Sequence, residues 1–163
     1  MLHLQAEGKT RLRDVTGNDL PIFFEHQRDP EANRMAAFLP RERELFMAHW
    51  EKILADRTVM AKTIVVEDEV AGNIVSFEQA GRRLVGYWIG RKHWGKGIAT
   101  SALSHFLHVD AARPLHAYVA KHNRASARVL ENCGFEVSGE QIGAPGPDGE
   151  EVEEFLMVLT AAG

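Results

Sequence analysis

The chain has few or none of the features that mark disulfide-bonded, nucleic-acid-binding, membrane or secreted proteins. It holds one cysteine, Cys133, among 163 residues, so no disulfide can form within it. Its 19 basic residues do not outnumber its 23 acidic ones, which argues against a protein that grips duplex nucleic acid. No apolar run approaches the roughly 18 residues that span a membrane. No apolar stretch follows Lys9, Arg11 and Arg13, as it would in a signal peptide. We therefore expect a soluble, cytoplasmic protein that binds neither nucleic acid nor membranes.

What is present is typical of a globular protein. Hydrophobic residues make up 45% of the chain and charged residues 26%, an ordinary balance for a fold with a buried core. The length of 163 residues predicts a single domain over residues 1–163.

The first third is predicted to be mainly helical. A short strand is expected over Leu12–Val15, and Thr16 with Asp19 forms a capping-box-like start to a helix. A loop containing Asp29-Pro30 and Asn33 is expected to follow. After it, a second helix presents an apolar stripe made of Phe46, Trp50, Ile53 and Leu54.

The middle of the chain changes to strand periodicity. Residues Met60–Val66, Val70–Phe77 and Leu84–Ile89 are rich in β-branched and aromatic residues and are separated by short turns. Parallel neighbours would need longer crossovers, so these runs predict an antiparallel meander.

The remainder alternates helix and strand. A helix with an apolar face begins at Ile98, a strand covers Leu115–Val119, and a helix over Asn123–Asn132 ends at Gly134. A strand begins at Phe135, and after a turn-rich loop the run Phe155–Leu159 is expected to close the sheet. The fold class is therefore α+β, a mixed sheet in which the meander leads into a βαβ-type end.

The most informative segment is Gly95-Lys96-Gly97, directly before a helix. Glycines there let backbone N–H groups turn inward, and the positive end of the helix dipole adds to them, which makes a phosphate cradle. Arg91 and Lys92 add positive charge nearby. The alternative is a tight strand-to-helix turn beside solvated basic residues.

Two phosphate-binding templates fail on this segment. A P-loop would need a serine or threonine where Gly97 stands. A dinucleotide fingerprint would need glycine where Thr100 stands, and it would follow a parallel βαβ unit rather than a meander.

A third pattern fits. The strings Tyr87-Trp88-Ile89, Trp94-Gly95-Lys96-Gly97-Ile98-Ala99-Thr100, Asn123-Arg124-Ala125-Ser126 and Cys133-Gly134-Phe135 resemble the GNAT superfamily of acetyl-CoA-dependent N-acetyltransferases. The chain is most similar to the branch that acetylates the amino termini of ribosomal proteins. Gly97 and Ala99 fill the small positions of the superfamily motif.

The resemblance implies a function for individual residues. Backbone amides of the cradle would hold the coenzyme A pyrophosphate, and Tyr87 and Ile89 would offer backbone groups to the pantetheine at a bulge, where two strands splay apart. The hydroxyl of Ser126 would lie near the departing sulfur. The residues so assigned to the cofactor are Tyr87, Ile89, Gly95, Lys96, Gly97, Ile98, Ala99, Thr100 and Asn123. Asn123 is equally explained as a helix N-cap, and Ser126 as a polar residue of a first helical turn.

The chain also departs from the family pattern. Arg83 and Leu84 stand where many relatives carry a glutamate, and Leu130 stands where many carry a tyrosine. Glu78, at the end of the preceding strand, is the nearest substitute for the general base, and it could equally be an ordinary rim carboxylate. Glu150–Glu154 is either a solvated strand entry or an acidic rim that attracts a cationic amine.

The resulting hypothesis is an N-acetyltransferase that moves an acetyl group from acetyl-CoA to a primary amine, either a small molecule or a protein amino terminus. The chain is expected to act without a metal, as a monomer or homodimer; His105 and His108 share a helix but have no evident further ligands. An acyl-CoA-binding sensor and an ATP-binding protein remain alternatives.

Overall fold

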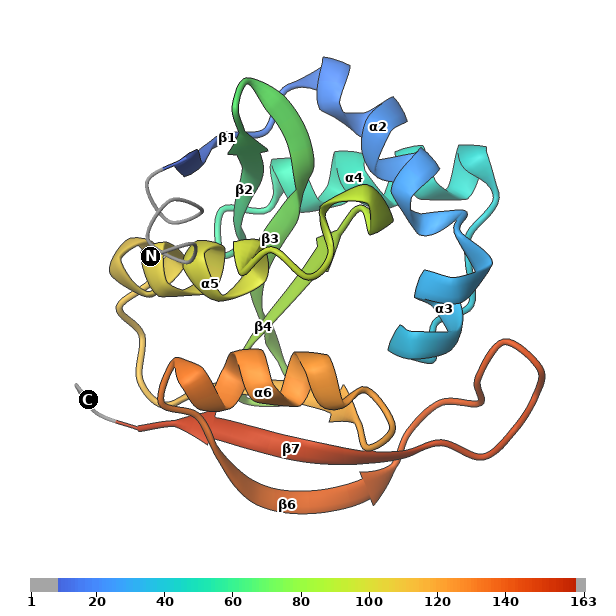
Figure 1. Cartoon of the computed structure of the whole chain (residues 1–163), viewed down its shortest axis with the longest axis vertical. Helices are drawn as coiled ribbons and strands as arrows, with labels where there is room; N and C mark the ends of the chain where they lie inside the picture. The colour runs from blue at the N-terminus through green and yellow to red at the C-terminus, as the bar shows by residue number, and fades with distance from the viewer. Residues whose placement is uncertain (1–8, 161–163) are drawn as a thin grey trace.

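The structure, a computed structural model, describes residues 9–160, which form one seven-stranded sheet with helices on both faces (Figure 1). The strand order is β1-β2-β3-β4-β5-β7-β6. The strands are β1 (Thr10–Asp14), β2 (Met60–Val66), β3 (Glu69–Gln79), β4 (Arg82–Ile89), β5 (Leu115–Ala120), β6 (Glu136–Ile142) and β7 (Glu153–Leu159). The helices are α2 (Leu20–Gln27), α3 (Pro30–Ala36), α4 (Arg43–Ala55), α5 (Ile98–Val109) and α6 (Arg124–Asn132), with 3-10 turns η1 (Gly17–Asp19) and η2 (Arg91–His93).

The predicted meander is confirmed: β2, β3 and β4 pair antiparallel in sequence order. The predicted bulge in β4 is wrong. The register of β3 with β4 runs unbroken from the Gly72–Ile89 pair to the Gln79–Arg82 pair. Strand β4 is therefore regular up to its last residue. The edge of β4 that faces β5 is nevertheless mostly unpaired, and this has another cause.

That cause is the splay of β4 and β5. The two strands are parallel and joined by α5 as a βαβ unit, and over the described residues their register consists of one pair, Leu84 with His116. Both residues lie near the beginnings of their strands, so the strands separate toward Ile89 and Ala120. The splayed strand pair that the resemblance implied is thus present.

The last strand does not close the sheet as predicted. Strand β7 lies between β5 and β6 and pairs antiparallel with both, so β6 forms the edge. The interior position takes the more apolar strand: Met157 and Leu159 bury one face of β7, whereas Val137 and Ile142 of β6 are more than half exposed.

A second correction concerns the segment after Asp29, which is helix α3 and not a loop. The Asp29 side chain accepts a hydrogen bond from the Glu31 N–H at 3.0 Å, and Pro30 occupies the first helical turn, where its missing N–H costs nothing. Ala37 ends the helix in a left-handed conformation (φ 54°).

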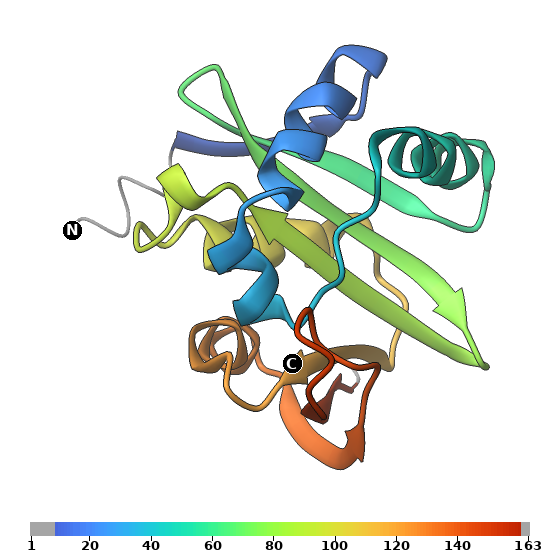
Figure 2. The same ribbon diagram turned by 90° about the vertical axis from the view of Figure 1, so that its right-hand side faces the viewer.

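Strand alternation divides the core between the two faces of the sheet. One face packs Ile64 and Ile74 against α5 and α6, and the other packs Val75 against Phe23 of α2 and Trp50 of α4. Figure 2 shows the amino-terminal helices on the near side of the β3–β4 hairpin and α5 behind it.

Candidate functional site

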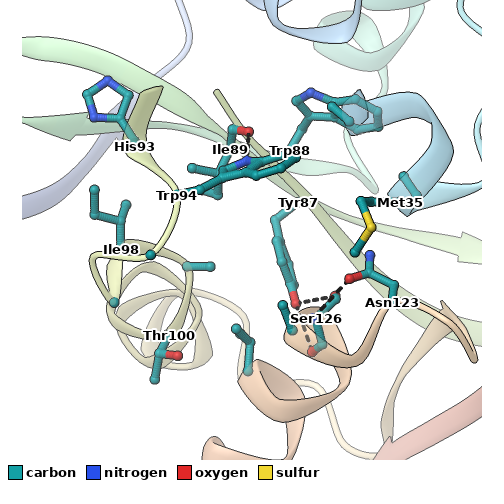
Figure 3. Close-up of a pocket in the computed structure, with 17 residues that line it drawn as sticks. Met35, Tyr87, Trp88, Ile89, His93, Trp94, Ile98, Thr100, Asn123 and Ser126 are labelled. Atoms are coloured by element: carbon teal, nitrogen blue, oxygen red, sulfur yellow. Dashed lines mark hydrogen bonds between the residues drawn. The ribbon is translucent and has the colours of Figure 1, made fainter. Parts of the chain in front are cut away.

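A cavity of about 450 Å³ lies where β4 and β5 separate, with walls from α3, β4, the turn before α5, and α6 (Figure 3). It is lined by Ala32, Met35, Ala36, Tyr87, Trp88, Ile89, His93, Trp94, Gly95, Gly97, Ile98, Ala99, Thr100, Asn123, Ala125, Ser126 and Val129. The cavity therefore brings together eight of the nine residues that the resemblance assigned to the cofactor, and Ser126 with them.

The ninth, Lys96, is exposed between the two glycines and is not among the lining residues. The other basic residues expected near the cradle are engaged elsewhere. Arg91 forms an ion pair with Asp29 at 3.2 Å, and Lys92 forms one with Glu69 at 2.5 Å. The attraction of the cradle for an anion must therefore come mainly from its backbone.

The cradle is built by two glycines in left-handed conformations, Gly95 at φ 73° and Gly97 at φ 75°. Helix α5 begins directly after Gly97, and its first backbone bond runs from the Ser101 N–H to the Gly97 carbonyl. The N–H groups of residues 98–100 precede that bond, so they have no acceptor within the helix. They point out of its N-terminal end, where an anion is stabilised.

The opposite wall is the first turn of α6. The side-chain oxygen of Asn123 accepts a hydrogen bond from the Ser126 N–H at 3.2 Å, which makes Asn123 the N-cap. Figure 3 shows that its amide nitrogen points away from this bond, toward Met35. Asn123 can therefore cap the helix and still donate a hydrogen bond into the cavity.

A tyrosine hydroxyl reaches this wall from β4. The Tyr87 hydroxyl lies 2.7 Å from the Ser126 Oγ and 3.3 Å from the Ser126 carbonyl oxygen. Burial raises the pKa of Tyr87 to about 12, so the phenol is neutral at physiological pH. The family resemblance implied a role for the backbone of Tyr87 and none for its hydroxyl. Strand alternation was the available signal, because it places Tyr87 on the same face as Val85 and Ile89, toward α5 and α6.

Two tryptophans close the end of β4. The Trp94 indole N–H donates to the Ile89 carbonyl at 2.9 Å, so this carbonyl points toward Trp94 and not toward β3. Trp88 points to the other face, where its indole N–H donates to the His26 carbonyl at 3.2 Å and its ring packs edge-on against Phe38.

Glu78 does not belong to the cavity. It pairs with Arg83 in the β3–β4 register, six residues before Ile89, which is roughly 20 Å along the strand. Its side chain is 55% exposed and lies 3.5 Å from the Arg83 guanidinium. Among the described residues that line the cavity there is no carboxylate.

Arg83, which stands where many relatives carry a glutamate, has a structural role. Its Nε donates to the carboxylate of Asp110 at 2.9 Å, and the Ser76 hydroxyl donates to the same carboxylate at 2.6 Å. Asp110 is the C-cap of α5, so Arg83 ties this helix to the hairpin far from the cavity. Leu130 is buried in the core against α5.

A second hollow of about 470 Å³ adjoins the first across the end of α3. It is lined by Arg34, Lys121, His122, Asp148, Glu150, Glu151, Val152 and Glu153. The His122 Nε2 lies 2.8 Å from the Arg34 carbonyl oxygen, a contact that joins α3 to the turn before α6. Three carboxylates of the predicted acidic rim, Glu150, Glu151 and Glu153, thus line this hollow together with the cations Arg34 and Lys121.

Within residues 9–160, no three histidine, cysteine or carboxylate side chains are grouped as metal ligands. No helix in the same range is long and apolar enough to cross a membrane.

Comparison with known proteins adds to this geometry. The model of the acetyltransferase (GNAT) domain family matches residues 9–136. The curated protein N-acetyltransferase p20 of Bacillus licheniformis, itself uncharacterised, is 28% identical over 143 residues, which cover 78% of this chain and 79% of that protein.

Two solved structures share the fold. The spermidine N-acetyltransferase of Vibrio cholerae in complex with CoA and spermine has a TM-score of 0.82 at 17% identity, covering 94% of this chain and 96% of that one. RimJ of Mycobacterium smegmatis in complex with CoA-disulfide has a TM-score of 0.75 at 19% identity, covering 93% and 82%.

Proposed function

Because the chain belongs to the GNAT family of acetyltransferase domains, we propose that it transfers an acetyl group from acetyl-CoA to a primary amine. One observation carries the proposal: a single cavity between splayed strands has the free amides of α5 at one side and the Tyr87–Ser126 hydroxyl pair at the other.

The cofactor would lie across the cavity. The amides of residues 98–100 would bind its pyrophosphate, and the two left-handed glycines would keep side chains out of its path. The pantetheine would follow the open edge of β4, which β5 leaves unpaired beyond Leu84 over the described residues. The side-chain amide of Asn123 would donate to it from α6.

The chemistry needs alignment more than acid-base groups. The neutral amine attacks the thioester carbonyl, a C–N bond forms, and the carbonyl electrons move onto oxygen, where a backbone N–H of β4 stabilises the charge. The electrons on oxygen then re-form the C=O bond as the C–S bond breaks, and the electron pair of the C–S bond goes to sulfur. The proton lost by the amine passes to water, since no carboxylate is among the described lining residues. The Ser126 hydroxyl stabilises the thiolate with a hydrogen bond.

The acceptor would enter beside α3. Its Ala32, Met35 and Ala36 form an apolar wall, and the hollow with Asp148 and Glu150 lies just beyond. An amine is cationic before it is deprotonated, so this acidic rim would attract it. The Vibrio cholerae neighbour holds spermine, which supports a cationic acceptor, either a small amine or a protein amino terminus.

The test is turnover with a panel of amines: peptides with free amino termini, polyamines and amino acids. We expect CoA release that depends on the amine, with the acetylated product identified by mass spectrometry. The absence of a carboxylate among the lining residues of the described range also suits a sensor that binds acyl-CoA without reacting. Tight acetyl-CoA binding without release of CoA for any amine would favour that second function.

A further inference from the structure

The hydroxyls of Tyr87 and Ser126 contact each other directly, which binding of the cofactor alone does not require. Two elements far apart in sequence, β4 and α6, bring these hydroxyls to 2.7 Å across the cavity, and both residues line it (Figure 3). Tyr87 is one of only two tyrosines in the chain, and the other, Tyr118, does not line the cavity.

The pair has two possible hydrogen arrangements. In the first, Tyr87 donates to the Ser126 carbonyl oxygen at 3.3 Å, and Ser126 donates to Tyr87. Both hydrogens then point into the protein. In the second, Tyr87 donates to the Ser126 Oγ, so the serine hydrogen must point elsewhere, and the cavity is the open direction. Rotation of the two hydroxyls converts one arrangement into the other.

We propose that Tyr87 is a positioning residue for the leaving sulfur: by donating to Ser126, its hydroxyl turns the serine hydrogen toward the sulfur of CoA. This inference rests on the proposed function. Tyr87 also polarises Ser126, because a hydroxyl that accepts a hydrogen bond is a stronger donor.

The step is balanced without proton transfer from either hydroxyl. The C–S bond breaks, its electron pair goes to sulfur, and the thiolate accepts a hydrogen bond from Ser126. The proton lost by the amine passes to water, and the thiolate takes a proton from solvent after release. Tyr87 keeps its proton throughout, consistent with a phenol whose pKa burial raises to about 12.

The kinetic test uses Tyr87→Phe, Ser126→Ala and the double variant. Tyr87→Phe keeps the buried ring and removes only the hydroxyl, so acetyl-CoA affinity should be unchanged while kcat falls roughly three- to tenfold. The double variant should match Ser126→Ala alone, because Tyr87 acts through Ser126. Tyr118→Phe is the matched control: its hydroxyl accepts a bond from Arg82 at 3.4 Å, and kcat should be unchanged.

A binding measurement separates positioning from general packing without any turnover. We compare the affinities of CoA and desulfo-CoA across the pH range in which a thiol ionises. In the wild-type protein, the preference for CoA should grow as the thiolate forms, and Tyr87→Phe and Ser126→Ala should both weaken that growth. Equal preference in wild type and variants would overturn the inference.

A further variant keeps the Tyr87 hydroxyl and changes its strength as a hydrogen-bond donor. It guards against the case in which Tyr87→Phe disturbs folding. In a Tyr118→Phe background, biosynthetic 3-fluorotyrosine labels position 87 alone. A fluorinated phenol is a stronger donor, so kcat should hold or rise, and a fall would contradict the inference. Failure of the proposed function is distinct, because it appears in the wild-type protein as no CoA release with any amine.

Discussion

Gly95 and Gly97 show how two residues of the smallest type shape the turn before α5. Both adopt left-handed conformations, φ 73° and 75°, and a Cβ added at either position would meet no atom within 4 Å. A methyl side chain at these positions would therefore clash with nothing in the free protein, so steric crowding is not the reason for glycine. Backbone conformation is the reason, since it aims the following amides at the cavity.

We expect Gly97→Ala to weaken acetyl-CoA binding roughly five- to tenfold. A left-handed alanine costs about 1–2 kcal/mol, so the free turn relaxes and binding must restore the strained form. Gly81→Ala is the control, because Gly81 has φ 79° and equal open space but lies in the β3–β4 turn. Both variants should lose similar stability in urea unfolding, and titration calorimetry should show weaker binding for Gly97→Ala alone. Equal affinities would disprove the cradle.

The absence of a carboxylate among the described lining residues leads to a prediction about pH. Without a fixed base, kcat/KM should rise with pH as the acceptor loses its proton and should level off near the acceptor's own pKa. A peptide amino terminus should level off near pH 8, and an alkylamine with a lysine-like pKa of about 10.4 should still be rising there. Glu78→Gln should leave both profiles unchanged. A common inflection for the two acceptors would reveal a titrating group of the protein.

At the scale of elements, Asp19 joins the amino-terminal segment to the sheet. Its buried carboxylate accepts two hydrogen bonds from Arg13 of β1, at 2.7 and 2.9 Å, one from the Thr16 N–H, and one from the Thr63 hydroxyl of β2. Burial raises the pKa of Asp19, but these hydrogen bonds lower it by more, to about 2. The bonds anchor the start of α2, and with it the chain that leads to α3 and the cavity.

This carboxylate should contribute to the loss of stability in acid. Its folded pKa is below the unfolded value of about 3.9, so its contribution of about 2 kcal/mol is present above pH 4 and is lost as the pH falls toward 2. Asp19→Asn should therefore be less stable at neutral pH and should lose less stability between pH 4 and pH 2. Asp14→Asn is the control, because Asp14 is exposed and its carboxylate forms an ion pair with Lys62 on the surface. Free energies of urea unfolding at each pH measure both, and parallel wild-type and Asp19→Asn curves would refute the role.

At the scale of the whole molecule, the cavity gathers α3, β4, α5 and α6. A cofactor bound there as we propose would connect segments that the splay leaves apart. Acetyl-CoA at about 100 times its Kd should stabilise the fold by about 2.7 kcal/mol. For a chain of this length, that corresponds to a rise in Tm of roughly 5–10 °C. ATP at the same concentration should raise the Tm far less, since it lacks a pantetheine to occupy the splay. An equal rise with ATP would favour a nucleotide-binding protein.

Much of the fold followed from local sequence. The meander, α5, α6 and the cradle all depend on periodicity, turn residues and glycines close together in the chain, and the structure contains each of them. The missed helix α3 was also local, because Asp29 and Pro30 are a cap and a first-turn residue that can be mistaken for a loop. The predicted bulge was wrong because the free edge of β4 arises from its neighbour β5.

The sequence by itself determined the glycine turn before α5 and the amides that follow it, since these are consecutive residues. Tertiary structure decided the rest. Glu78 of β3 and Tyr87 of β4 lie on neighbouring strands, but Glu78 pairs with the start of β4, far from the cavity. The packing of α6 against β4 brings the Tyr87 hydroxyl to Ser126, 39 residues later in the chain. The local sequence pattern also could not predict that β7 lies between β5 and β6. Contacts between distant segments depend on how whole elements pack, and no spacing within one segment specifies them.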